Sequence, residues 1–198
     1  MGKFLRRDKV DHEDDTQQHL QMTIDTVSEL KSELIRQKTT VFKLSNFEQR
    51  KIFNSSANSP PFYASPGGYQ MCIRVYANGC DDAKDTHVSV YAFLMLGEND
   101  HHLSWPFTGT VTIELLNQLE DNNHISHNVR LPSDCANRVT DGEVARMGYG
   151  SSRYIPHSSL GYDATRNCQY LKDDCLCFRV KAEAASPKPW LKTTANFW

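Results

Sequence analysis

The side chains that commonly bind metals are scattered along this sequence rather than gathered in a motif. Structural zinc sites use paired ligands at close spacing, typically two cysteines followed by a second Cys or His pair. Neither Cys175-x-Cys177 nor His124-x-x-His127 is accompanied by such a second pair in the sequence. We therefore expect neither a bound metal nor a cofactor.

The acidic pairs and short motifs of the sequence do not indicate catalysis either. Asp81-Asp82 and Asp173-Asp174 are adjacent residues, which point to opposite faces of a strand and in turns usually cap backbone N–H groups. The chain lacks a G-x-S-x-G elbow, a phosphate-binding loop and a dinucleotide-binding glycine turn. We predict that this chain is not an enzyme.

Composition and charge narrow the class of protein further. The 198 residues are 39% hydrophobic and 23% charged, which suits one sizeable domain with an appendage. A net charge of -2 without a Lys/Arg-rich stripe argues against nucleic acid as a partner. No apolar run approaches the roughly 20 residues that cross a bilayer, and the N-terminus lacks a signal-peptide core. We expect a cytoplasmic protein without direct membrane insertion, whose six cysteines are reduced thiols.

The N-terminal part of the chain has the apolar spacing of an amphipathic helix. Gly and Pro are absent from residues 3–58, and β-branched residues begin at Thr39, so the helix should end near Lys38. Such a stripe packs either on its own domain or against other chains in a coiled coil, and about three heptads do not separate the two. The stripe residues are Leu20, Ile24, Val27, Leu30 and Leu34.

The period of the apolar pattern changes to two after Val41, which is typical of strands. In the segment Thr86 to Met95, alternate residues from Val88 to Leu94 face one way, and Tyr91 and Phe93 face the other. Turn-forming residues separate the strand-like runs, and this spacing predicts a β-sandwich. The other predicted strands are 41–47, 71–77, 109–116 and 174–182.

Two long segments closely resemble the C-terminal domain of the TRAF (tumour necrosis factor receptor-associated factor) family. They are PPFYASPGGYQMCIRVYANG, Pro60 to Gly79, and THVSVYAFLMLGENDHHLSWPF, Thr86 to Phe107. The resemblance extends over most of residues 41–182, with Phe42 in place of the family's usual tryptophan. It implies a mainly β fold, an eight-stranded antiparallel β-sandwich of the TRAF/MATH type preceded by a short coiled-coil α-helix.

This resemblance also implies a domain organisation and an oligomeric state. Residues 1–39 would form a trimerising helix, 40–184 the TRAF-C/MATH sandwich and 185–198 a C-terminal tail. The helix would join three chains through Leu20, Ile24, Val27, Leu30 and Leu34. Three linked domains gain avidity for clustered receptors, so the helix would belong to the binding mechanism.

The implied function is a trimeric adaptor in signal transduction that binds short extended peptides on a sheet edge. Its partners would be P-x-Q/E-like motifs of receptor cytoplasmic tails or of other adaptors. Two alternatives stay open at this point. The chain could be the partner-recruiting portion of a larger RING-type ubiquitin ligase, or a purely structural MATH association domain.

The resemblance carries over to particular residues of the predicted peptide site. Arg74 and Tyr76 fall on the positions of a family arginine and a family tyrosine. In the family, these two side chains contact an acidic or aromatic residue late in the bound peptide. Tyr91 falls on the aromatic that lines a pocket for the peptide's proline. Cys80 stands where several members carry an aspartate that bonds a peptide threonine.

Two further segments complete the predicted site. In the loop PSDCANR, Ser133, Asp134 and Cys135 lie where one branch of the family has three serines that hold a glutamine side chain. Only one serine remains, and an aspartate there would repel a peptide carboxylate. Met147, Gly148 and Tyr149 resemble a segment that forms an edge strand and an apolar pocket in another branch. We therefore expect a hybrid or new motif preference.

Overall fold

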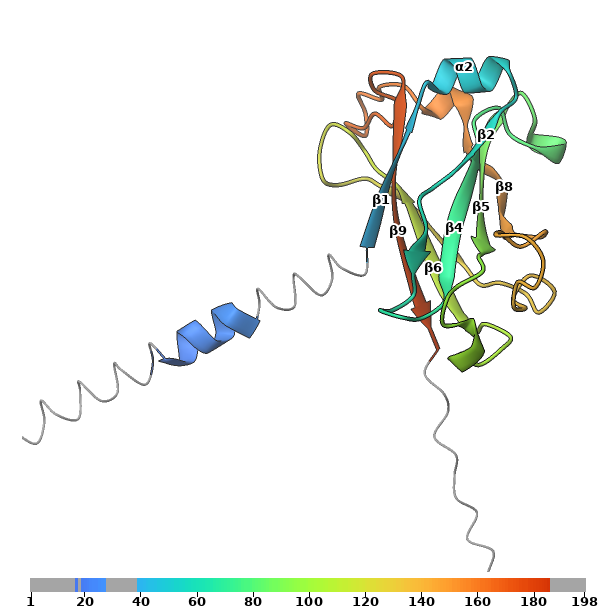
Figure 1. The fold of residues 1–198 in the computed structure, drawn as a ribbon. Helices are drawn as coiled ribbons and strands as arrows, with labels where there is room; N and C mark the ends of the chain where they lie inside the picture. Colours follow the sequence, from blue (N-terminus) through green and yellow to red (C-terminus); the bar gives the residue numbers. More distant parts are fainter. Residues whose placement is uncertain (1–16, 18, 28–38, 186–198) are drawn as a thin grey trace, which may run out of the picture. The chain divides into compact units, whose positions relative to one another are not determined.

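The computed structural model describes residue 17 and residues 19–27 and 39–185, which divide between two units, Met1–Thr39 and Thr40–Trp198 (Figure 1). In the first unit residues 19–27 are helical. Leu20, Ile24 and Val27 are 62%, 52% and 58% exposed in the single chain. Leu30, Leu34, the predicted helix end and the tail from residue 186 lie outside the described residues.

The second unit is a sandwich of two β-sheets, which confirms the predicted fold class (Figure 1). One sheet has the strand order β1 (Thr39–Ser45), β9 (Cys175–Ala184), β6 (Gly109–Leu115) and β7 (Ile125–Val129). The other has the order β2 (Ser56–Asn58), β4 (Gln70–Tyr76), β5 (His87–Leu94) and β8 (Tyr149–Pro156), with β3 (Phe62–Tyr63) also paired to β4. The short helices are α2 (Phe47–Ile52), η1 (Asp81–Ala83), η2 (Asp100–His102) and η3 (His157–Ser159).

The core between the sheets is formed by the alternate residues that the period-two pattern placed on one face. On β5, Val88, Val90, Ala92 and Leu94 are completely buried. Side chains of the facing sheet meet them because each strand presents every second residue inward. The largest fully buried side chains of the facing sheet are Phe178, Leu44, Ile113, Leu115 and Leu176.

The strand count differs from the predicted eight because one strand is interrupted. Between β2 and β3 the chain runs through Ser59, Pro60 and Pro61, and proline has no backbone N–H for the ladder. Ser59 keeps the segment against β4: its N–H donates to the Ile73 carbonyl at 2.8 Å, and its hydroxyl accepts from the Ile73 N–H at 3.1 Å. The described residues therefore form nine strand segments.

A short helix replaces the predicted end of the first strand. Phe47 was expected in the strand, but β1 ends at Ser45 and Asn46 adopts a left-handed conformation with φ 58°. The α2 N-terminus is then held by Asp174, whose carbonyl accepts from the Phe47 N–H at 3.1 Å and whose carboxylate accepts from the Glu48 N–H at 2.9 Å. This confirms the capping role predicted for the carboxylate of Asp174.

All six cysteines are free, and four of them are buried: Cys72, Cys135, Cys168 and Cys175. Within the described ranges, no three His, Cys, Asp or Glu side chains are grouped as metal ligands would be. None of the described helices has the length and apolar character needed to cross a membrane.

Candidate functional site

The outer face of the β2-β4-β5-β8 sheet carries three of the predicted site residues. On β4, Arg74 and Tyr76 are half-buried and alternate with Ile73 and Val75, which are completely buried in the core. Arg74 pairs in register with Tyr91 of β5. The pleat therefore brings Arg74, Tyr76 and Tyr91 onto one outward face, as the spacing predicted.

The two tyrosines form an aromatic corner. Their rings meet edge to face, with centroids 6.1 Å apart and an interplanar angle of 87°. The Cys80 thiol donates to the Tyr91 phenol oxygen at 3.4 Å. Burial, followed by the contact with Cys80, raises the pKa of Tyr91, so the phenol stays neutral. Tyr91 is thus a fixed aromatic surface with a polar tip.

Arg74 is held in place without an acidic partner. Its Nε–H donates to Asn58 Oδ1 on β2 at 2.7 Å, and its guanidinium carbon lies 4.5 Å from the centroid of the Phe93 ring. Within residues 39–185, the salt bridges do not include Arg74. A buried or half-buried cation without a counterion is suited to bind a carboxylate.

Strand β8 lies at the end of the sheet order, so among the described residues its outer edge is unpaired. Its backbone is close to β5 because Gly150, which pairs with Tyr91, has no side chain. A Cβ at Gly150 would lie 2.1 Å from the Val90 carbonyl oxygen. The glycine also leaves the outer face beside Tyr91 uncovered. An extended peptide can add to such an edge by backbone hydrogen bonds.

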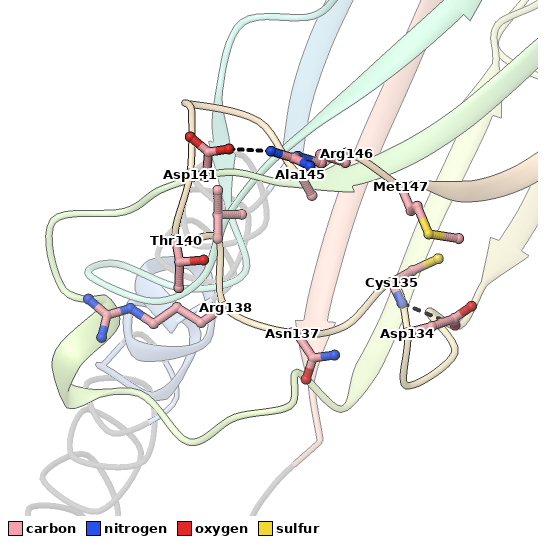
Figure 2. A pocket seen from close by; sticks show the side chains of 10 residues that line it. Asp134, Cys135, Asn137, Arg138, Thr140, Asp141, Ala145, Arg146 and Met147 are labelled. Atoms are coloured by element: carbon pink, nitrogen blue, oxygen red, sulfur yellow. Dashed lines mark hydrogen bonds and ion pairs between the residues drawn. The ribbon is translucent and has the colours of Figure 1, made fainter.

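Of the predicted loop residues, Asp134 and Cys135, together with Met147, line a second pocket of about 210 Å³, and Ser133 does not (Figure 2). Figure 2 shows the Cys135 and Met147 side chains on the same side of this pocket as Asp134. Burial, followed by the neighbouring Asp134 carboxylate, raises the pKa of the Cys135 thiol, so this thiol is not an activated nucleophile. Ser133 is exposed, and its carbonyl accepts from the Asn137 amide at 2.8 Å. The pocket also includes Arg138, Asp141 and Arg146.

Cys135 connects this pocket with the sheet. Its thiol donates to the Gly148 carbonyl at 3.7 Å. Gly148 in turn approaches the outer-face aromatics, since a Cβ there would lie 2.6 Å from the Phe93 ring. The pocket and the outer face are therefore neighbouring parts of one surface.

Met147, Gly148 and Tyr149 were expected to form one edge strand, and this prediction was wrong for the first two. Strand β8 begins only at Tyr149, and Met147 and Gly148 precede it. Tyr149 pairs with Ala92, a core-facing residue, so its ring points toward the facing sheet. There it lines a different hollow of about 670 Å³ with Thr110, Thr112, Asn128 and Arg130.

Sequence reasoning missed Phe93, Asn58 and Gly150 as site residues. Phe93 was placed on the correct face, and its spacing of two from Tyr91 was the available signal. Asn58 gave no signal, because its contact with Arg74 depends on the pairing of β2 with β4. The importance of Gly150 follows from the packing of two strands that are far apart in sequence.

Comparisons of the sequence and of the structure with known proteins point to the same family. The sequence model of the TRAF/meprin MATH domain matches residues 54–179. A TNF receptor-associated factor 5 of Mus musculus is 36% identical over 147 residues, and a TNF receptor-associated factor 1 of Homo sapiens is 31% identical over 128 residues. These alignments cover 74% and 65% of this chain but only 26% and 30% of the relatives.

A solved structure shows the same similarity in three dimensions. The TRAF5 structure of Notothenia coriiceps has a TM-score of 0.69 and 27% sequence identity with this chain. The alignment covers 96% of this chain and 99% of the other.

Proposed function

Because the chain belongs to the TRAF/meprin MATH domain family, and within it resembles the TRAF signalling adaptors, we propose that it captures extended peptides on the free edge of β8. The observation that carries this proposal is that the edge of β8, unpaired among the described residues, lies two strands from a guanidinium without a counterion. β8 ends the sheet order, and its Gly150 pairs with Tyr91, which itself pairs with Arg74. Backbone pairing on β8 and side-chain contacts on β5 and β4 are thereby available to one extended peptide.

The side chains around the edge favour a particular ligand chemistry. Arg74 suits a carboxylate, and the edge-to-face pair of Tyr76 and Tyr91 suits an apolar or aromatic residue. Asp134 lies at the neighbouring pocket and repels a second carboxylate. The ligand is therefore a P-x-Q/E-like segment of a receptor tail or adaptor, with its acidic residue on Arg74 rather than at Asp134.

The helical unit supplies the second part of the function. Leu20, Ile24 and Val27 form an exposed apolar face in the single chain, and trimer formation would bury it. Trimers in the cytoplasm would meet clustered receptor tails with three linked sites. The chain acts in this proposal by binding and not by catalysis.

Replacing Arg74 by alanine should weaken capture of acidic peptides about 10- to 100-fold, because a hydrogen bond to a charged group contributes about 1.5–3 kcal/mol. An array of P-x-Q and P-x-E peptides, followed by fluorescence anisotropy titration of the strongest binder, measures the loss. Thermal unfolding should change little, since Arg74 is only half-buried.

A matched control is Arg166→Ala, which removes an arginine paired with Asp163 at 2.7 Å in the loop before β9. This control should bind like the unaltered chain. Equal affinity of the Arg74→Ala variant and the unaltered chain for every acidic peptide would contradict the assignment of Arg74.

A further inference from the structure

The Phe93 ring lies beside the Arg74 guanidinium, and Phe93 is itself only 4% exposed. It lies on β5 on the same outward face as Tyr91, directly opposite Cys72 of β4. From there its ring reaches diagonally to the guanidinium, whose central carbon lies 4.5 Å from the ring centroid. A cation at this distance over a ring face is attracted by the ring quadrupole.

Two contacts together fix the orientation of the Arg74 side chain. Asn58 on β2 accepts the Nε–H at 2.7 Å, and Phe93 on β5 supports the planar group from the other side of β4. Within the described residues, the hydrogen bonds of Arg74 use only Nε. The two terminal amino groups therefore stay available, and together they can meet a carboxylate in a forked contact.

Gly148 determines where the Phe93 ring can lie. A Cβ at residue 148 would lie 2.6 to 2.7 Å from three atoms of the ring, which is too close for any side chain. The absence of a side chain at Gly148 thus lets the ring occupy this position. The Cys135 thiol donates to the Gly148 carbonyl at 3.7 Å and connects the glycine to the pocket loop.

We infer that Phe93, seated against Gly148, is a positioning residue that holds the Arg74 guanidinium ready for a ligand carboxylate and so sets the preference for acidic peptides. This inference rests on the proposed function, because it concerns the same peptide site. It predicts that loss of the ring affects acidic ligands selectively. A role in packing alone would weaken all ligands equally.

The experiment compares Phe93→Leu, Phe93→Tyr and Gly148→Ala in the full chain. The probes are the strongest fluorescein-labelled acidic peptide of the array and its twin in which the acidic residue is the corresponding amide. Phe93→Leu should weaken the acidic peptide about two- to fivefold, the range expected for a cation–π contact, and leave the amide twin within about twofold. Phe93→Tyr should restore the preference because it keeps the ring, and Gly148→Ala should lower it by displacing the ring.

A second measurement tests the stack without any ligand. In NMR spectra of the free chain, the Arg74 side-chain protons should lose their ring-current shift in Phe93→Leu and keep it in Phe93→Tyr. An unchanged shift in Phe93→Leu, or equal weakening of both peptides, overturns the inference while leaving the proposed function in place. Failure of every acidic peptide to bind the unaltered chain overturns the proposed function and this inference with it.

Discussion

Replacing Gly150 by alanine should lower the free energy of unfolding by about 2–3 kcal/mol and greatly weaken peptide capture. A Cβ at Gly150 would lie 2.1 Å from the Val90 carbonyl oxygen and 2.6 Å from the Tyr91 Cα. Both are backbone atoms of β5, so a side-chain rotation cannot relieve the clash, and β8 must separate from β5 at Tyr91. Denaturant unfolding measures the loss of stability, and anisotropy titration with the array peptide measures the loss of binding.

Gly161→Ala is the matched control for this change. A Cβ at Gly161 would meet nothing within 4 Å, so its unfolding free energy should change by less than about 0.5 kcal/mol. Equal stability of the Gly150→Ala and Gly161→Ala variants would show that β8 does not approach β5 as closely as described.

Replacing Ile24 by lysine should convert the proposed trimer into single chains. Ile24 lies in the apolar face with Leu20 and Val27, and a lysine there places like charges together in the seam. Binding to one soluble peptide should stay unchanged. Binding to a surface dense in that peptide should fall about 100-fold, because the avidity of linked sites is lost. Light scattering gives the mass, and surface binding at high and low peptide density gives the avidity.

The control for the helix is Gln21→Lys, which adds the same charge at a position beside the seam, where Gln21 bonds to Asp25 at 2.9 Å. This variant should keep the mass and the avidity of the unaltered chain. A mass of one chain for the unaltered protein at micromolar concentration would contradict the trimer.

Strands in which many residues are buried could be predicted from the sequence, and edge strands with few buried residues could not. Along most of β9, buried and half-buried residues alternate, and on β5 every second residue from Val88 to Leu94 is apolar and completely buried, so the period of two is visible. β7 and β8 are edge strands with one and two buried residues respectively, so neither segment gives a clear apolar period of two. The six-residue helix α2 depends on Asp174, a partner 126 residues from Glu48, so local sequence does not reveal it.

Some features of the site likewise follow from local spacing in the sequence, and others from contacts between distant segments. Arg74 and Tyr76 share a face because of their spacing of two, and the family resemblance marked them as binding residues. The stack of Arg74 on Phe93 and the fit of Gly148 against that ring depend on β4, β5 and the segment just before β8 coming together. The side of β8 to which Tyr149 points depends on where that strand begins, which the sequence leaves open by a residue or two.

Amide hydrogen exchange with and without the array peptide tests the central claim, capture by strand addition at β8, most directly. Peptide should slow the exchange of those β8 amides that do not pair with β5, while amides on β1 and β2, which end the sheets on the other side, keep their rates. Protection of the β1 or β2 edge instead, or binding without any added protection on β8, would contradict it.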